Sequence, residues 1–387
     1  MQVLCLQPRG FGTCAKNIGI KDRTLDFTVI ASEIPASAAA LFTQNRFSGA
    51  AIAVGREHVA NRQLQAFVIT SKNANVATGE QGLANIREVV RLVADELAIA
   101  PEDVLPSSTG VIGRQLPMEK IRQGIHGIAQ EMRSGHFEQA ALAIMTTDTH
   151  PKMHCSRIGN AVLVGIAKGV GMIEPNMATM LSYFVTDAKI APDVLHQSLK
   201  EAVDLSFNMV SIDTDTSTSD TVAIMANGLA GEVDLGEFRC ALQRMARELA
   251  KDLARDGEGA TKLIEVTVDA AASFAQAKRV AKSILNSPLV KTAIFGADPN
   301  WGRIAMAIGK CEEQAAIVPE KVSIAFGNLL VYQGRSLGEE NLTRLKAYLN
   351  NPEIVIHVSL GLGDSKATVW GCDLSPDYVS INAAYAT

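Results

Sequence analysis

The sequence predicts a mixed α/β fold in which strands and helices are interleaved. Apolar and polar residues alternate around 27–30 and again around 65–69, a pattern that is typical of short strands. Residues 80–97 instead show the helical period, beginning after Thr78 or Gly79. The two patterns follow each other without a regular strand–helix–strand repeat, which favours an α+β or mixed α/β fold over a barrel.

Further elements follow in the second half of the chain. One face of the first helix carries five apolar residues, Leu83, Ile86, Val89, Val90 and Val93. We expect three more helices, at 236–254, 277–285 and 341–349; glycines 257 and 259 follow the first, and Asn350-Asn351-Pro352 closes the last. Strands are predicted at 180–185, 262–268, 322–326, 329–332 and 354–358. No repeat or Pro/Ser-rich linker marks a domain boundary.

Composition narrows the class of protein. The 387 residues are 47% hydrophobic and 20% charged, which is ordinary for a globular chain with a substantial core. The net charge is −5 and the basic residues are scattered, so we expect no nucleic-acid partner. The longest central apolar run, 161–173, is interrupted by Lys168 and glycines, and we expect no membrane span. The N-terminus lacks the features of a secretory signal, which predicts a cytoplasmic location.

The cysteine and histidine residues give little sign of a metal site. The six cysteines are far apart and include no C-x-x-C pair, so we interpret them as reduced thiols. His150 and His154 are four residues apart, but Pro151 disfavours a helix there and no third ligand is evident. We therefore expect no metal and no cofactor.

The most unusual passage runs from Gly165 to Leu181. Lys168 stands among glycines, which let the backbone approach a ligand or another segment closely. Pro175 and Asn176 favour a turn before Thr179, which precedes an apolar strand. A threonine placed at a strand start suits an N-terminal nucleophile whose freed α-amine can act as the base. The spacing alone leaves the ordinary alternatives open, a strand threonine and a lysine in a surface loop.

Motifs along nearly the whole chain resemble those of the ornithine acetyltransferase (glutamate N-acetyltransferase) family. The central passage matches the family's processing site, K-G-x-G-M-x-x-P-x-x-A-T-M/L-L, at 168–181. The other matching passages occur in the family's order, at 73–79, 108–113, 145–149, 213–218, 256–262, 298–303 and 381–387. One such match would be weak evidence, but seven in register are specific.

The resemblance implies self-cleavage between Ala178 and Thr179. The Thr179 hydroxyl would attack the Ala178 carbonyl, giving an N-to-O acyl shift followed by hydrolysis. The products would be an α chain, 1–178, and a β chain, 179–387, assembled as an α2β2 tetramer. The implied fold is a sandwich of sheets and helices shared with self-processing aminopeptidases. Thr109 and Gly110 match the family's oxyanion pair, a hydroxyl and a backbone N–H; by itself the passage would be an ordinary turn.

The resemblance also implies a substrate site. Family positions map onto Thr146, Lys168, Thr179, Glu258, Asn382 and Thr387. We expect Lys168 to face the substrate α-carboxylate and Glu258 to pair with the ornithine ammonium. Thr147 is an alternative to Thr146. At the extreme C-terminus, Asn382 and Thr387 would belong either to a frayed tail or to a tail that closes the site.

Three other matching passages are expected to have structural roles. Asn73 and Asn75 should satisfy backbone groups in a turn near the site. The run 213–220 lacks the glycine and terminal glutamate of a calcium loop, and we expect a hydrogen-bonded network there. Residues 298–302 predict a turn with a packing role.

The leading hypothesis is transfer of an acetyl group from N-acetylornithine to glutamate through acyl-Thr179, in arginine biosynthesis or a specialised-metabolism variant. The sequence departs from the commoner family pattern at Thr214, Ser219, Ala77 and 383–384, which leaves the physiological acceptor open. Acetyl-CoA as a second donor also stays open. The alternatives are an N-terminal-nucleophile amidohydrolase or aminopeptidase, which would release the acyl group to water, and a non-catalytic paralogue that binds an amino acid.

Overall fold

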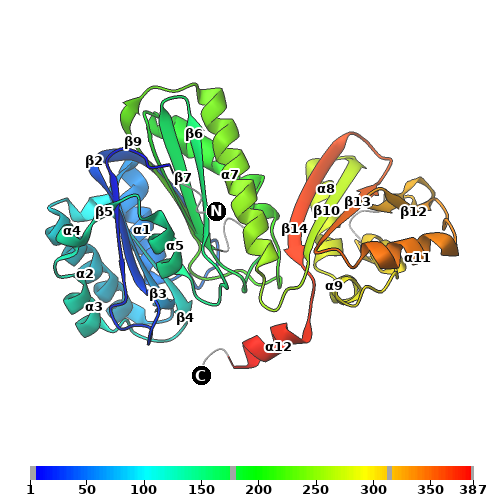
Figure 1. Ribbon diagram of the computed structural model, residues 1–387, viewed down its shortest axis with the longest axis horizontal. Helices are drawn as coiled ribbons and strands as arrows, with labels where there is room; N and C mark the ends of the chain where they lie inside the picture. Colours follow the sequence, from blue (N-terminus) through cyan, green and yellow to red (C-terminus); the bar gives the residue numbers. More distant parts are fainter. Residues whose placement is uncertain (1–5, 175–179, 312–315, 385–387) are drawn as a thin grey trace. The chain divides into compact units, whose positions relative to one another are not determined.

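The computed structural model describes residues 6–174, 180–311 and 316–384, and the chain divides into two compact units. Unit 1 comprises 1–208 and 215–253, and unit 2 comprises 209–214 and 254–387. Figure 1 labels their helices and strands. None of the helices in the described part of the chain combines the length and the apolar character that a bilayer span requires.

Unit 1 is built on a nine-stranded sheet. Its strands are β1 (Phe11–Lys16), β2 (Phe27–Phe42), β3 (Gln63–Asn73), β4 (Val104–Val111), β5 (Arg133–Ser134), β6 (Lys152–Ile158), β7 (Ala161–Lys168), β8 (Leu181–Ala188) and β9 (Thr221–Gly231). The order is β4-β3-β2-β9-β8-β7-β6, with β1 paired to β2 and β5 paired to β1. The pairs β3–β4 and β8–β9 are parallel, and the others are antiparallel.

The long strand β2 joins two halves of this sheet. Its first part pairs with β1 and β3, the register shifts between Ala31 and Ala36, and its last part pairs with β9. The two halves face each other, because the rings of Phe67 on β3 and Tyr183 on β8 lie 5.2 Å apart. Buried side chains of both halves form one shared core. The sandwich implied by the family resemblance is therefore present in unit 1.

Helices cover both outer faces of the sandwich, as Figure 1 shows. They are α1 (Ala50–His58), α2 (Gly79–Leu97), α3 (Met118–Ile125), α4 (Ile128–Glu131), α6 (Pro192–Asp204) and α7 (Leu235–Arg255). Helix α5 (Phe137–Ile144) instead contributes to the core shared by the two half-sheets. Helices α1 to α4 share a second core with β1, β2 and β3. Helix α6 packs on β2 and β9, and Met245 of α7 packs over Gly165 of β7. The short helix α5 contacts strands of both half-sheets.

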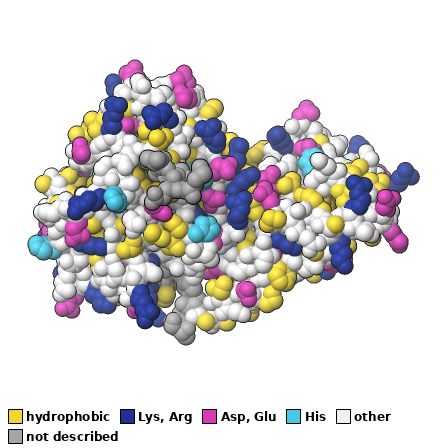
Figure 2. Space-filling model, viewed as in Figure 1, with side chains coloured by type: hydrophobic (Ala, Val, Ile, Leu, Met, Phe, Trp, Pro, Cys, Tyr) yellow, Lys and Arg dark blue, Asp and Glu magenta, His cyan; other side chains and the backbone are white. Residues whose placement is uncertain are grey.

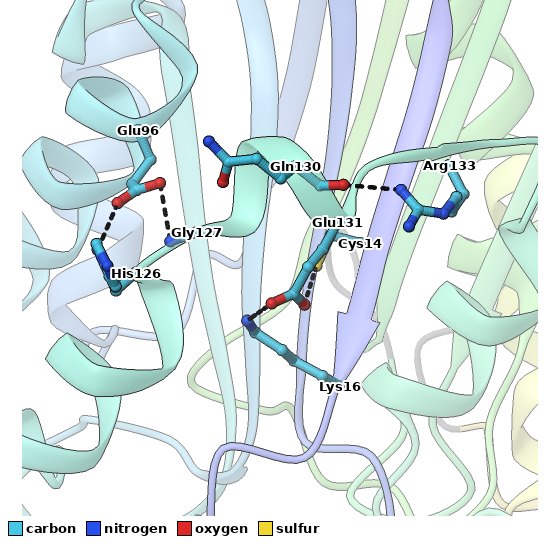
Figure 3. A network of polar contacts seen from close by, with 8 residues as sticks. All are labelled: Cys14, Lys16, Glu96, His126, Gly127, Gln130, Glu131 and Arg133. Atoms are coloured by element: carbon cyan, nitrogen blue, oxygen red, sulfur yellow. Dashed lines mark hydrogen bonds and ion pairs between the residues drawn. The ribbon is translucent and has the colours of Figure 1, made fainter.

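Polar contacts join α4 to β1 and α2 to the residue before α4, as Figure 3 shows. Lys16 Nζ lies 2.9 Å from Glu131 Oε1, and the Cys14 thiol donates to the same carboxylate. Glu96 of α2 accepts the backbone N–H of Gly127, just before α4, at 2.9 Å. Burial, the largest influence, raises the pKa of the Cys14 thiol to about 11. Cys14 is therefore a protonated packing residue at neutral pH.

Unit 2 has a five-stranded sheet of order β12-β11-β13-β10-β14. The strands are β10 (Leu263–Ala271), β11 (Ser323–Phe326), β12 (Leu329–Gln333), β13 (Glu353–Ser359) and β14 (Ser365–Cys372); the helices are α8 (Phe274–Leu285), α9 (Pro288–Phe295), α10 (Gly302–Gly309), α11 (Glu339–Tyr348) and α12 (Pro376–Ala383). Helix α8 packs on β10 and β14. The expected packing role of 298–302 is confirmed by Trp301, whose ring lies 5.4 Å from that of Tyr332.

Charged side chains of both signs are interspersed on the surface seen in Figure 2. This agrees with the scattered basic residues and the net charge of −5. The described part of the chain contains no group of three His, Cys, Asp or Glu side chains that could hold a metal ion. His154, weighed above as a ligand, lies on β6 and contacts Asp252 Oδ2 at 2.7 Å.

Candidate active site

The predicted oxyanion pair lies at the end of β4. Thr109 is buried, and its neighbour Gly110 has a φ of +130°, which side-chain-bearing residues rarely adopt. A Cβ at Gly110 would lie 2.2 Å from the carbonyl carbon and oxygen of Lys72 on β3. Only glycine lets the two strands approach this closely, so the structure explains this residue type at 110.

The expected turn near the site is also present, between β3 and α2. The side chain of Asn73 accepts the backbone N–H of Asn75 at 2.8 Å, and the Asn75 amide donates to the carbonyl of Gly82 at 2.9 Å. Both side chains satisfy backbone groups, as predicted.

Lys168 reaches the oxyanion pair from the last position of β7. The residue is buried, and its Nζ donates to the Thr109 hydroxyl at 3.2 Å. Gly169 follows with a φ of +134° and turns the chain away. The structure thus brings together two predicted site residues that are 59 positions apart in the sequence. The surface-loop alternative for Lys168 is wrong, because the side chain is inside the protein.

Thr146 lies just after α5, in a turn closed by Asp148. The Thr146 backbone N–H donates to Asp148 Oδ2 at 3.1 Å. Asp148 Oδ1 accepts from Lys152 Nζ at 2.9 Å and from the Gly169 backbone N–H at 2.8 Å. Asp148 lies within the matching passage 145–149, but its spacing there predicts no role for it. The contact with Gly169, 21 positions away, exists only in the folded chain.

The Asp148 side chain is buried, yet its carboxyl group is ionised. The side chains of Asp148 and Lys152 are both fully buried. Burial by itself would raise the pKa of Asp148, but Lys168, Lys152 and the Gly169 N–H together hold that pKa below its ordinary value. The carboxylate therefore carries its charge at neutral pH.

Two further charged residues border the site and were missed. Asp220, just before β9, is fully buried, and burial raises its pKa well above the ordinary value, against the influence of Ser217, Lys168 and Thr43. Lys21 donates to the carbonyl of Met145, next to Thr146, at 2.6 Å. Burial, and to a smaller extent Lys168, lowers the pKa of Lys21 to about 8, while Asp26 and Asp148 oppose that shift.

The start of β8 is fixed beside these residues. Leu181 pairs with Lys168 of β7 on one side and with Thr221 of β9 on the other. The carbonyl of the buried Met180 accepts the Thr221 backbone N–H at 3.0 Å. Ala178 and Thr179, the predicted cleavage residues, lie outside the described residues. The cut and the nucleophile therefore stay predictions, as does the division into chains 1–178 and 179–387.

Glu258 and Asn382, two other predicted substrate residues, meet within unit 2. Glu258 is buried and accepts from Asn382 Nδ2 at 2.8 Å. Helix α12, which carries Asn382, begins at a Ser375 cap, and its Tyr378 hydroxyl donates to Asp213 at 3.3 Å. Up to residue 384 the tail is thus docked rather than frayed. Thr387 lies outside the described residues.

The run 213–220 is divided between the two units, at 214/215. In its unit 1 part, the Thr216 hydroxyl donates to the carbonyl of Glu174 at 3.0 Å, and the Ser217 hydroxyl accepts the Ser219 backbone N–H at 3.2 Å. Thr43 donates to the carbonyl of Ser217 at 2.8 Å. The expected hydrogen-bonded network is present in this part.

Comparison with known proteins agrees with the motifs. The family model described as "ArgJ family" matches residues 13–387. "Arginine biosynthesis bifunctional protein ArgJ 2" of Nostoc sp. is 54% identical over 98% of this chain and 98% of its own. "Glutamate N-acetyltransferase Oat2" of Streptomyces clavuligerus is 50% identical over the same two shares. A crystal structure of the arginine biosynthesis bifunctional protein argJ from Bacillus halodurans is 43% identical, covers 51% of this chain and 96% of that chain, and gives a TM-score of 0.49.

The family model and the two relatives match nearly the whole chain, and they place the protein in the class of acyl-transferring enzymes. Within that class it belongs to the ArgJ family. The resemblance drawn from the motifs is thereby confirmed.

Proposed function

We propose that this enzyme transfers the acetyl group of N-acetylornithine to glutamate through an acyl-enzyme on Thr179. The observation that carries the proposal is the contact of Lys168 with Thr109, at the point where the start of β8 pairs with the end of β7. Lys168 thus pairs with the start of the strand that follows the nucleophile, and its ammonium contacts Thr109, the neighbour of Gly110. The relatives' names, glutamate N-acetyltransferase among them, favour transfer over release to water.

The proposed mechanism begins with self-cleavage. The Thr179 hydroxyl attacks the Ala178 carbonyl, and water then hydrolyses the resulting ester. The new α-amine of Thr179 takes the hydroxyl proton when Oγ attacks the acetyl carbon of N-acetylornithine. Thr109 and Gly110 stabilise the negative charge that develops on the acetyl oxygen. The C–N bond breaks and ornithine leaves with the proton. The glutamate amine then attacks the acyl-Thr179 ester, the bond between Thr179 Oγ and the acyl carbon breaks, Oγ regains a proton from the amine, and N-acetylglutamate leaves.

The remaining family positions would hold the substrate. Lys168 and Thr146 would bind the α-carboxylate, since a buried ammonium strongly favours a charge-assisted hydrogen bond. Glu258 would pair with the ornithine ammonium, and Asn382 and Thr387 would close the site. We further propose an α2β2 assembly of the two chains and a cytoplasmic location.

Intact-mass measurement tests both halves of the proposal. Protein incubated with N-acetylornithine should give two chains, with one acetyl increment on the C-terminal chain. Thr179→Ala should remain one chain and lose activity; a Thr179→Ala protein that is still cut would refute the assignment. Free acetate in place of N-acetylglutamate would favour the hydrolase alternative. Assays with other amino acids and with acetyl-CoA would define the acceptor and any second donor.

A further inference from the structure

The Asp148 carboxylate contacts both segments that carry the proposed carboxylate-binding residues. One of its oxygens accepts the Thr146 N–H at 3.1 Å. The other accepts the N–H of Gly169, the residue after Lys168, at 2.8 Å. This side chain therefore joins the turn after α5 to the residue that follows β7, two elements that also share the apolar core of the sandwich.

The Asp148 carboxylate interacts with several ammonium groups in this part of unit 1. Lys168 and Lys152 are the two cations that act on it most strongly, and Lys21 is a third. Asp220 is a second carboxyl group on which Lys168 acts, and burial raises its pKa well above the ordinary value. Lys168 is the stronger of the two cations that hold the pKa of Asp148 down.

We propose that Asp148 is a positioning residue of the substrate site: by holding the Thr146 turn and the Gly169 backbone, it sets where the Lys168 ammonium lies. The inference rests on the proposed function, in which Lys168 and Thr146 bind the substrate carboxylate. Without Asp148, the two segments would lose their common acceptor. Carboxylate binding would then weaken in ground state and transition state alike, which raises KM more than it lowers kcat.

A purely structural role for the buried pair Asp148–Lys152 is the competing explanation, and a double variant separates the two. Removing one partner alone leaves an uncompensated buried charge, whereas replacing both removes that penalty. In Asp148→Asn/Lys152→Met the structural explanation predicts wild-type KM once stability is restored. Positioning by Asp148 predicts a protein that is folded but has a KM for N-acetylornithine raised about tenfold or more, with kcat within about threefold.

Ornithine binding gives a readout that does not depend on turnover. Wild-type protein is first titrated with ornithine in a calorimeter. If wild-type protein neither binds ornithine nor transfers the acetyl group, the proposed function is wrong, and the role of Asp148 is not the cause. Given wild-type binding, we expect a Kd about tenfold weaker in the double variant. An unchanged Kd and KM in a folded double variant would overturn the role of Asp148.

Asp187→Asn is the matched control. Asp187 is also buried and accepts two backbone N–H groups, from Arg9 at 3.0 Å and Val162 at 2.7 Å, but it lies at the opposite end of β8 from Leu181. This variant should lose stability and keep the wild-type KM. If the double variant does not fold, Asp148→Glu serves instead, because it keeps the charge opposite Lys152 and displaces the carboxylate by one methylene. A folded Asp148→Glu with wild-type KM would equally overturn the proposal.

Discussion

At the residue scale, the pKa values of two buried carboxyl groups near Lys168 are shifted in opposite directions. Asp148 gains two ammonium neighbours and backbone N–H donors, so its pKa falls despite burial. Asp220 is equally enclosed, but one of its oxygens has no hydrogen-bond partner, and burial decides its pKa. Divergent pKa values of neighbouring acids are typical of enzyme active sites.

The raised pKa of Asp220 predicts a stability gain in Asp220→Asn. The folded pKa lies above the unfolded one, so the folded state binds the proton more tightly. Stability is therefore lost as pH rises from the unfolded pKa through the folded one. The neutral amide has no such cost, so Asp220→Asn should raise the free energy of unfolding by about 1 kcal/mol or more at pH 7.5. Urea titrations should show the gain shrinking towards pH 4; a gain that grows there would contradict the protonated state.

The resemblance to the family predicted Thr109, Gly110, Thr146 and Lys168, because these residues match family positions; their spacing alone left ordinary alternatives open. Asp148, Asp220 and Lys21 were not predicted as site residues. Their importance comes from burial and from contacts that the fold creates, such as those of Asp148 with Gly169 and of Lys21 with Met145, which a single sequence does not reveal. Lys168 illustrates the difference, since the sequence gives its identity and only the fold gives its contact with Thr109.

At the element scale, β7 is buried along its whole length and packs between the shared core and α7. Val164 and Ile166 point into the sandwich core. Gly165 points the other way, where an added Cβ would lie 2.7 Å from the Phe184 ring and 2.9 Å from the sulfur of Met245. This glycine sets how closely α7 approaches the sheet.

Gly165→Ala should therefore overpack the layer between β7 and α7. We expect a loss of about 1–3 kcal/mol in the free energy of unfolding, measured by urea denaturation. Gly309→Ala is the control, because a Cβ there would meet nothing within 4 Å. Equal stabilities of the two variants would show that the layer can relax around a methyl group.

Elements with a clear period were predicted well. Among the strands that are buried along most of their length, β8 was predicted at 180–185 but others were not. The helix predicted at 80–97 is α2, and that at 236–254 is α7. The strand predicted around 27–30 is only the beginning of β2, which runs to Phe42. Strand β9 was not predicted at all. Its first seven residues are all buried, so the alternation that marks a half-exposed strand is missing.

At the scale of the whole molecule, unit 2 incorporates a short piece from the middle of the chain. Residues 209–214 interrupt unit 1, and Val210 bridges to Trp370 of β14. Lys291 is buried and donates to the carbonyls of Ile212 at 2.9 Å and Cys372 at 2.6 Å. One ammonium thus joins the inserted piece to the end of β14.

Lys291→Met should loosen unit 2 at this junction. Two buried carbonyls would lose their donor, and we expect a cost of about 2–5 kcal/mol. Hydrogen exchange should accelerate around 209–214 and 370–373 and stay unchanged in β3 and β4 of unit 1. Uniform acceleration over both units would mean that they open together.

The three boundaries between the units were beyond prediction from the sequence. The last falls within the final turn of α7, after Leu253, where no proline, serine or charge run interrupts the helical pattern. The other two enclose residues 209–214, and one of them lies inside a matched motif, 213–218. All three depend on long-range packing rather than on local composition.

The pairing of β8 with β9 bears on the order of events in a growing chain. Translation delivers Met180 before it delivers Thr221, whose N–H binds the Met180 carbonyl. The peptide bond at which we propose the cut therefore exists on the ribosome before β9, the strand that pairs with the residues after it. On the proposed mechanism, we expect self-cleavage only after Thr221 has been translated.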